Sequence, residues 1–157
     1  PSEIEMEFLL RDSASGGTLY PWGDSPLPPA RFGNYPDDAF ARSQPGWRLW
    51  VLRGYDDGYP RLAPVGRHLP DAHGLFDLSG NVSEWCEDAF VMYGVSYEAF
   101  YEPDATPSRI LRGGSWHSHP GRLRSSWRTD ADADGARSWW GFRCATPIPA
   151  LEPDAPR

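Results

Sequence analysis

The sequence predicts a single domain that combines a short N-terminal helix, several short strands and much irregular structure. The chain has 157 residues, which suits one domain with a substantial core. Its 16 glycines and 17 prolines disfavour long helices and favour turns. A hydrophobic content of 39%, with 14% aromatic residues, is typical of a globular protein. We therefore expect a compact core whose connections are mostly loops.

The elements follow from local patterns along the chain. Ser2 is placed as the N-cap of a helix over residues 1–11, with Glu5 at the capping-box position and Ile4, Phe8 and Leu9 on one face. Short strands are expected over 47–52, 109–112 and 140–145, and a turn or short helix entering a strand over 74–86. Residues 25–46 are predicted to be ordered coil, 88–108 a surface loop, and 147–157 a Pro-rich tail that follows a domain ending at residue 146.

Charge and cysteine content exclude several functional classes. The net charge of −7 argues against general nucleic-acid binding, and no apolar segment is long enough to span a bilayer. Cys86 and Cys144 are too few for a disulfide scaffold; we expect two buried free thiols, with a bridge between them as the alternative. Because the sequence opens directly on a capped helix, we also expect that part of the domain lies upstream, so localisation is not read from this N-terminus.

The segment between two glycine-containing motifs is the strongest candidate for a functional surface. Arg112-Gly113-Gly114-Ser115-Trp116 opens it and Gly141-Phe142-Arg143-Cys144 closes it. Paired glycines allow a strand to bend close to other groups. A rigid frame that presents polar and aromatic side chains is typical of binding sites. The candidate ligand-binding residues are Trp116, His117, Ser118, His119, Arg122, Trp127, Thr129, Asp130, Asp132, Ser138 and Trp139.

Five ordered motifs resemble one family. They read PSEIEMEF, YPWGD, GLFDLSGNVSEW, LRGGSW and GFRCA, and they run from residue 1 to about residue 145 in order. The sequence is similar in these motifs to the formylglycine-generating enzymes, or sulfatase-modifying factors. The resemblance implies an irregular α+β fold of the C-type-lectin-like kind, with low regular secondary structure and bound calcium. It also implies that the N-terminal portion of the family's domain lies upstream of Pro1.

The resemblance implies two structural calcium sites. Calcium prefers several oxygen ligands from carboxylates and carbonyls, often within a tight loop. The first site would use the side chains of Asp77 and Glu84 and the carbonyls of Gly80 and Val82. The second would use the side chains of Asn34 and Asp57 and the carbonyls of Tyr35 and Tyr59. The alternatives are a helix cap for Asp77 and an ion pair with an arginine for Glu84.

The chemistry of the family's defining enzymes is not supported by the residues present. Those enzymes oxidise a target cysteine to formylglycine with oxygen and copper, and their cysteine pair falls shortly after the Gly-Gly-Ser motif. Residues 115–128 contain no cysteine, and serine cannot replace a thiolate ligand of Cu(I). Cys144 matches a family position suited to packing or to a disulfide, whose usual partner position is Leu10 here. We therefore expect no copper site.

The remaining side chains allow simpler interpretations. His117 and His119 at i and i+2 could share a metal ion if His68, His73 or a residue in the portion expected upstream supplied a third ligand. Histidines on a loop are more often polar contacts. The arginines of the segment could be salt-bridge partners in an acidic chain. We expect Trp140 to be a core residue and Trp139 to face outward.

Three hypotheses about function remain. The first is a binding module that holds a protein, peptide or small-molecule ligand through residues 116–140, in one form the variable protein of a diversity-generating retroelement. The second is an oxidative enzyme of the family's iron-dependent branch, similar to sulfoxide synthases, with iron-binding histidines in an upstream domain. The third is a formylglycine-generating enzyme with a displaced cysteine pair. The missing cysteines favour the first hypothesis, so we lean towards a protein without enzyme activity.

Overall fold

The computed structural model describes residues 1–12, 17–46, 50–102 and 104–147. Its regular core is a four-stranded sheet in the order β3-β2-β1-β4, formed by β1 (Ser83–Ala89), β2 (Arg109–Arg112), β3 (Thr129–Ala131) and β4 (Trp140–Gly141). The pairs β1–β2 and β2–β3 are antiparallel, whereas β1 and β4 are parallel. The register places Trp85 opposite Leu111 and shifts between Trp85 and Ala89. The expected strand over 109–112 is confirmed, and that over 140–145 is regular only at its first two residues.

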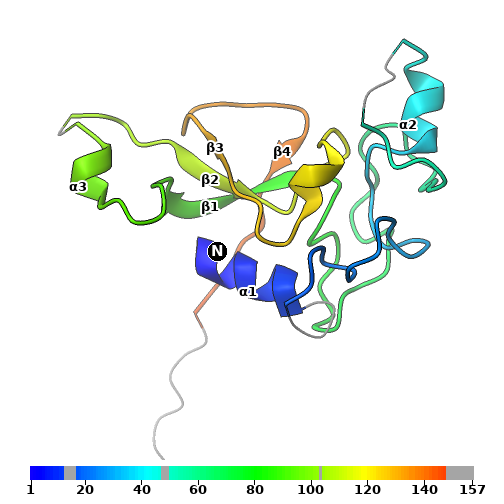
Figure 1. Ribbon diagram of the computed structural model, residues 1–157, viewed down its shortest axis with the longest axis horizontal. Coiled ribbons are helices and arrows are strands. Elements are labelled where there is room, and N and C mark those ends of the chain that lie inside the picture. The colour runs from blue at the N-terminus through cyan, green and yellow to red at the C-terminus, as the bar shows by residue number, and fades with distance from the viewer. Residues whose placement is uncertain (13–16, 47–49, 103, 148–157) are drawn as a thin grey trace, which may run out of the picture.

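The helix α1 (Glu3–Asp12) packs against β1 and β2, below the sheet in Figure 1. The capping box is confirmed: the Ser2 amide donates to the Glu5 carboxylate at 2.8 Å, and the Glu5 amide donates to the Ser2 hydroxyl at 3.4 Å. The face predicted for this helix is wrong in part. Met6 and Leu10 are buried, whereas Ile4 and Phe8 are 78% and 61% exposed.

Two apolar clusters make up the core. The first lies between α1 and the sheet and contains Met6, Leu10, Leu78, Cys86 and Ile110. The second lies in the irregular half and contains Trp22, Tyr35, Leu52, Tyr55 and Leu123. The loop-rich half is thus held by its own aromatic core, in which Trp22 packs edge-on against Tyr35 at 5.2 Å. Figure 1 shows this half beside the sheet, with α2 at its outer edge.

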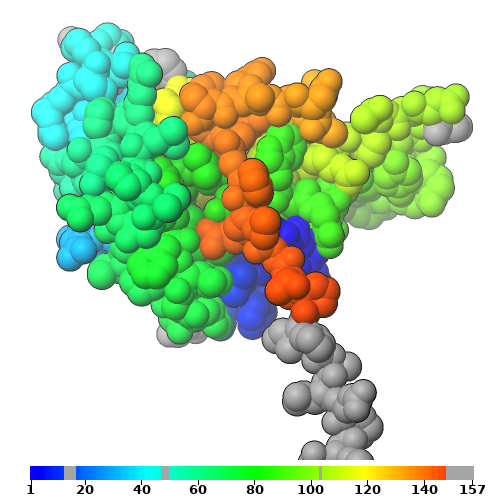
Figure 2. All heavy atoms as spheres, turned by 180° about the vertical axis from the view of Figure 1, so that it is seen from behind, coloured from blue at the N-terminus to red at the C-terminus, as the bar shows by residue number. Residues whose placement is uncertain are grey.

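Several short elements lie where loops were expected. The helix α2 (Asp38–Ser43) lies within the predicted coil, capped by the Asp37 carboxylate, which accepts from the Phe40 amide at 3.0 Å. The helix α3 (Tyr97–Phe100) lies in the predicted surface loop and projects from the body in both Figure 1 and Figure 2. A 3₁₀ helix, η1 (Pro120–Leu123), follows the Gly-Gly-Ser motif.

The strand expected over 47–52 is described only in part. Residues 47–49 lie outside the described residues, and Leu52 forms only an isolated bridge with Asp37.

The two cysteines are both free but differ in burial. Cys86 is buried beneath α1, as expected, and burial raises the pKa of its thiol to about 12. Cys144 is exposed, because β4 ends before it, and this corrects the expectation of two buried thiols.

Residues 140–147 cross the face shown in Figure 2 between the irregular half and the α3 projection. The rest of the predicted tail, from residue 148, lies outside the described residues.

None of the helices in the described residues is long and apolar enough to cross a membrane.

Candidate functional site

Arg112 fixes the base of the segment that carries the candidate surface. This residue ends β2, and its guanidinium is fully buried. It donates to the carbonyl of Ser125 at 2.8 Å and pairs with Glu3 and Glu7 of α1 at 3.4 and 3.2 Å. Arg128 reaches the same Glu3 carboxylate. Two arginines and two glutamates therefore attach the segment after η1 to the first helix.

The Gly-Gly-Ser turn sets the path from β2 into η1. Gly113 and Gly114 both have positive φ, at 84° and 70°, a region that favours glycine. A side chain at Gly113 would meet the carbonyl of Leu78 at 2.7 Å. The Ser118 hydroxyl accepts from the Ser115 amide at 2.9 Å, so it closes the turn and does not present a free group to a ligand.

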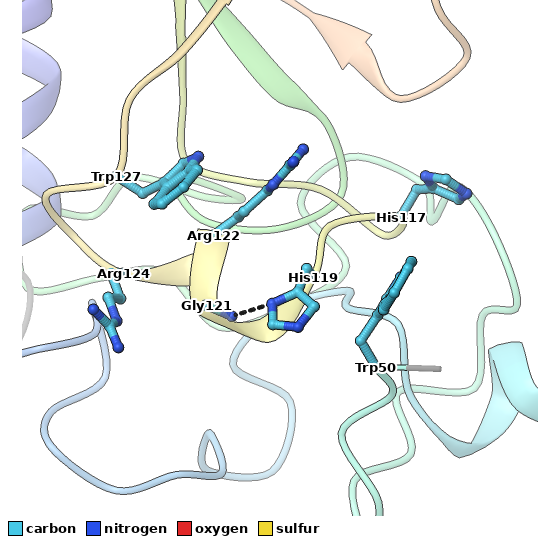
Figure 3. A pocket seen from close by; sticks show the side chains of 7 residues that line it. All are labelled: Trp50, His117, His119, Gly121, Arg122, Arg124 and Trp127. Atoms are coloured by element: carbon cyan, nitrogen blue, oxygen red, sulfur yellow. Dashed lines mark hydrogen bonds between the residues drawn. The ribbon is translucent and has the colours of Figure 1, made fainter. Parts of the chain in front are cut away.

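The segment 116–140 lines two cavities, and the larger of these two, of about 550 Å³, opens beside η1. Figure 3 shows its lining: Trp50 faces His119, Arg122 extends alongside Trp127, and Arg124 lies at another edge. The ring centroids of Trp50 and His119 are 5.4 Å apart, and the Arg122 guanidinium lies 5.7 Å from the Trp127 ring centre. The cavity is thus lined by aromatic rings, imidazoles and guanidinium groups.

A smaller cavity of about 240 Å³ lies on the other side of His117, which lines both. Here the His117 ring stacks on Trp139 at 4.4 Å and 21°. Burial lowers the pKa of His117, so the imidazole is neutral over a wider pH range than an exposed histidine. The lining residues are Phe40, Gln44, Arg61, Trp116, His117, Ser138 and Trp139.

The structure brings together seven of the predicted ligand-binding residues and not the other four. Trp116, His117, His119, Arg122, Trp127, Ser138 and Trp139 line one cavity or the other, although Trp116 is itself buried. Ser118, Thr129, Asp130 and Asp132 line neither. Thr129 and Asp130 belong to β3, and the Thr129 hydroxyl accepts from the Trp127 indole at 2.8 Å. Trp139 and Trp140 are both half-buried, so neither is wholly core nor wholly outward-facing.

Sequence reasoning missed the residues that close the cavities from the opposite side. Trp50, Phe40, Gln44 and Arg61 come from the irregular half of the chain. No local pattern connects these positions with residues 116–140. Only the tertiary fold brings them to one surface.

Glu84, the key residue of the first predicted calcium loop, is paired with an arginine. Arg143 contacts both Glu84 carboxylate oxygens, one at 2.7 Å, and donates to the carbonyls of Phe76 and Asp77. Burial raises the pKa of Glu84, and the Arg143 contact opposes this shift. The ion pair considered as the alternative for Glu84 is therefore present.

The side chain of Asp77, at the start of the same loop, contacts groups that lie outside the loop. Its carboxylate accepts from the Gly66 amide at 2.7 Å and lies 3.3 Å from His68 Nδ1. Burial alone would raise the pKa of Asp77, but these contacts bring it below its usual range. His73 lies 3.0 Å from Asp12, so neither His68 nor His73 is arranged to complete a site with His117 and His119. In the part of the chain that the structure describes, no three His, Cys, Asp or Glu residues are grouped to hold a metal.

Asn34 and Asp57, which would supply the side-chain ligands of the second predicted calcium site, differ in how their oxygens are hydrogen-bonded. Asn34 is fully buried, and its amide nitrogen donates to the Arg61 carbonyl at 2.6 Å. Its side-chain oxygen has no hydrogen-bond partner among the described residues. Asp57 accepts from the amides of Tyr35 and Tyr59 at 2.9 and 2.7 Å. Burial raises the pKa of Asp57 to about 7. Buried oxygen of this kind suits a cation better than it suits an apolar interior.

The fold and the Gly-Gly-Ser frame define a domain of the formylglycine-generating-enzyme type, and comparison with known proteins agrees. Residues 1–148 match the Sulfatase-modifying factor enzyme 1-like domain, so the chain belongs to that family. It is 32% identical to the formylglycine-generating enzyme of Streptomyces coelicolor over 92% of this chain and 45% of that protein. It is also 32% identical to the mouse "Inactive C-alpha-formylglycine-generating enzyme 2", over 93% of this chain and 42% of that protein. The chain spans under half the length of these relatives.

Solved structures confirm the irregular α+β fold. PvdO from Pseudomonas aeruginosa aligns with a TM-score of 0.61 and 27% identity, over 90% of this chain and 49% of that chain. The Treponema denticola variable protein 1 aligns with a TM-score of 0.56 and 23% identity, over 90% of this chain and 45% of that chain. At this identity the second likeness concerns the fold alone.

Proposed function

We propose that this domain is a binding module that holds a protein, peptide or small-molecule ligand on the surface formed by residues 116–140. The observation that carries the proposal is that this segment lines two cavities, which share His117 in their walls, and contains no cysteine. Cys86 is buried in the core beneath α1 instead. One relative is named an inactive formylglycine-generating enzyme, which supports the proposal. In this proposal the irregular scaffold presents a loop surface in the manner of a C-type lectin.

A mixed library of fragments and short peptides, followed by ligand-observed NMR, tests the proposal. We expect most hits to lose about tenfold or more in affinity in Trp139→Ala or Trp127→Ala, because a truncated aromatic at a binding hot spot costs about 1.4 kcal/mol or more. Phe142→Ala is the control, since Phe142 is 75% exposed and lines neither cavity. Hits that bind the two tryptophan variants as well as the native protein would place binding elsewhere and contradict the proposal.

Oxidative activity is the alternative, and each form of it has a direct test. Incubation with a peptide that carries the sulfatase cysteine motif, copper and oxygen should leave the mass of the peptide unchanged. Conversion of that cysteine to formylglycine would overturn the proposal.

The iron-dependent form of the alternative predicts a histidine-rich helical domain upstream in the complete gene. A retroelement origin predicts a nearby near-copy template with adenines at codons such as those of His117, Ser118 and Thr129.

Calcium belongs to the same proposal as a structural ion. The oxygens of Asn34, Asp57, Tyr35 and Tyr59 fit it best, because a buried amide oxygen there lacks a partner. The loop of Asp77, Gly80, Val82 and Glu84 fits less well, since the Arg143 guanidinium contacts both oxygens of Glu84. Calcium would coordinate these buried oxygen atoms and so stabilise a fold that has few hydrogen-bonded strands.

We expect calcium to raise the thermal midpoint of unfolding. At about 100 times its dissociation constant, the shift should be roughly 5–10 °C relative to the protein in chelator. Asp57→Asn should abolish most of this shift. Asp56→Asn should keep it, because Asp56 is a neighbouring carboxylate that pairs with Arg42 at 2.8 Å. Differential scanning calorimetry with and without calcium measures the effect, and an equal response of both variants would contradict this site.

A further inference from the structure

The larger cavity differs in charge from the chain around it. The whole sequence carries a net charge of −7, yet no aspartate or glutamate is among the described residues that line this cavity. Two arginines and two histidines do line it. In contrast, a third cavity of similar size contains Asp56 and Asp57 beside its arginines. The larger cavity is therefore a local basic site on an acidic protein.

Among the described residues, no carboxylate neutralises the two arginines of this cavity. Within the described ranges, neither Arg122 nor Arg124 has an aspartate or glutamate within ion-pair distance, whereas Arg112, Arg128 and Arg143 each have at least one. Arg122 instead lies 5.7 Å from the centre of the Trp127 ring. A guanidinium held against an aromatic face keeps its outer N–H groups available for a carboxylate or similar anion.

His119 adds a donor whose tautomer is set by the backbone. The Gly121 amide donates to His119 Nδ1 at 3.0 Å, shown as the dashed line in Figure 3. An imidazole nitrogen that accepts a hydrogen bond carries no proton, so neutral His119 has its proton on Nε2. The same ring lies 5.4 Å from Trp50. This side of the cavity therefore combines an N–H donor with a flat aromatic wall.

We propose that the cavity lined by Trp50, His119, Arg122 and Trp127 binds a small organic anion, in which a carboxylate is attached to a planar or apolar body. The Arg122 guanidinium contacts the anionic oxygens, the His119 N–H offers a second donor, and the two tryptophans contact the body. Arg124 adds positive charge from another edge of the cavity (Figure 3). The cavity volume of about 550 Å³ accommodates a ligand of one or two rings. The carboxylate can come from a free metabolite or from the terminus or side chain of a peptide. This inference rests on the proposed binding function and specifies its ligand class.

A matched set of probes isolates the contribution of charge. Indole-3-acetate, indole-3-acetamide and tryptamine share one ring and differ as anion, neutral amide and cation. Titration is followed in ¹H–¹⁵N spectra through the indole signals of Trp50 and Trp127, assigned from Trp50→Phe and Trp127→Phe. We expect the carboxylate to bind about tenfold more tightly than the amide, the size typical of a hydrogen bond to a charged group, and tryptamine to bind weakest.

Variants then assign the preference to the arginines. Arg122→Gln combined with Arg124→Gln should reduce the preference for carboxylate over amide to under about twofold. Arg137→Gln is the control, because Arg137 lies in the same segment but stacks on Trp140 at 5.2 Å and lines neither cavity. Loss of the preference in both variants would indicate a general charge effect and overturn the inference. A panel of peptides with free or amidated C-termini distinguishes a peptide carboxylate from a free metabolite.

The outcomes separate this inference from the binding function itself. Equal binding of all three probes, or strongest binding of tryptamine, overturns the preference for anions and leaves the binding surface intact. Failure of all three probes to bind at 10 mM, about the weakest affinity that such titrations detect, also overturns it. In that case the library screen with the Trp139 and Trp127 variants, which uses ligands of every charge, still decides whether residues 116–140 form a binding surface.

Discussion

Replacement of Arg112 by methionine should destabilise the domain by about 3–5 kcal/mol, the cost of removing a fully buried charge from its hydrogen-bonded ion-pair network. The Arg112 side chain is fully buried, and its guanidinium contacts Glu3, Glu7 and the carbonyls of Ser125 and Ser126. The methionine fills part of the volume but satisfies none of these oxygens. Urea unfolding followed by circular dichroism measures the loss as a lower midpoint at constant slope.

A second arginine on the same glutamate provides the control. Arg11 pairs with Glu7 at 3.1 Å, but its side chain is 48% exposed. Arg11→Ala should change stability by about 0.5 kcal/mol or less, because solvent screens an exposed i,i+4 pair. Addition of Glu7→Gln to Arg112→Met should recover part of the loss, since the half-buried carboxylate that has lost the Arg112 guanidinium is then neutral. Equal losses for Arg112→Met and Arg11→Ala would show that the network contributes little.

The same network explains why the buried face of α1 could not be predicted from apolar spacing. Ile4 and Phe8 lie four residues apart, and so do Met6 and Leu10, so periodicity alone offers two equivalent stripes. Glu3 and Glu7 lie on the side of Met6 and Leu10 and reach Arg112 at the end of β2. A partner more than 100 positions away in sequence therefore decides which face is buried.

Local signals predicted the elements that depend on neighbours in sequence. The capping box of Ser2 and Glu5, the strand Arg109–Arg112 and the glycine turn after it all follow from short motifs. The three-residue strand β3 was not predicted, because it exists only as a partner of β2. The candidate site divides in the same way: residues 116–140 were identified, whereas Trp50 could not be connected with them. The family motifs therefore predict the fold, whereas the cavity can be identified only from the tertiary structure.

Replacement of Gly80 by alanine should cost about 3–5 kcal/mol, the sum of backbone strain and overpacking. Gly80 has φ +82°, and a Cβ there would lie 2.5 Å from the carbonyl oxygen of Asn34 and 2.8 Å from the Tyr35 ring. Neither neighbour can move easily, because Tyr35 is fully buried in the second core cluster. The Gly80 amide also donates to the Gly113 carbonyl at 3.0 Å, which joins this loop to the Gly-Gly-Ser turn.

Gly74 separates the two contributions to this loss. It lies in the same motif with φ +79°, but a Cβ there would have nothing within 4 Å. Gly74→Ala should therefore cost only about 1–2 kcal/mol, the strain of a left-handed residue with a side chain. The difference between the two variants in urea unfolding reports the close approach of Gly80 to Asn34 and Tyr35. Equal losses would mean that the backbone conformation alone requires glycine at residue 80, and that the loop can move away from the Asn34 carbonyl at little cost.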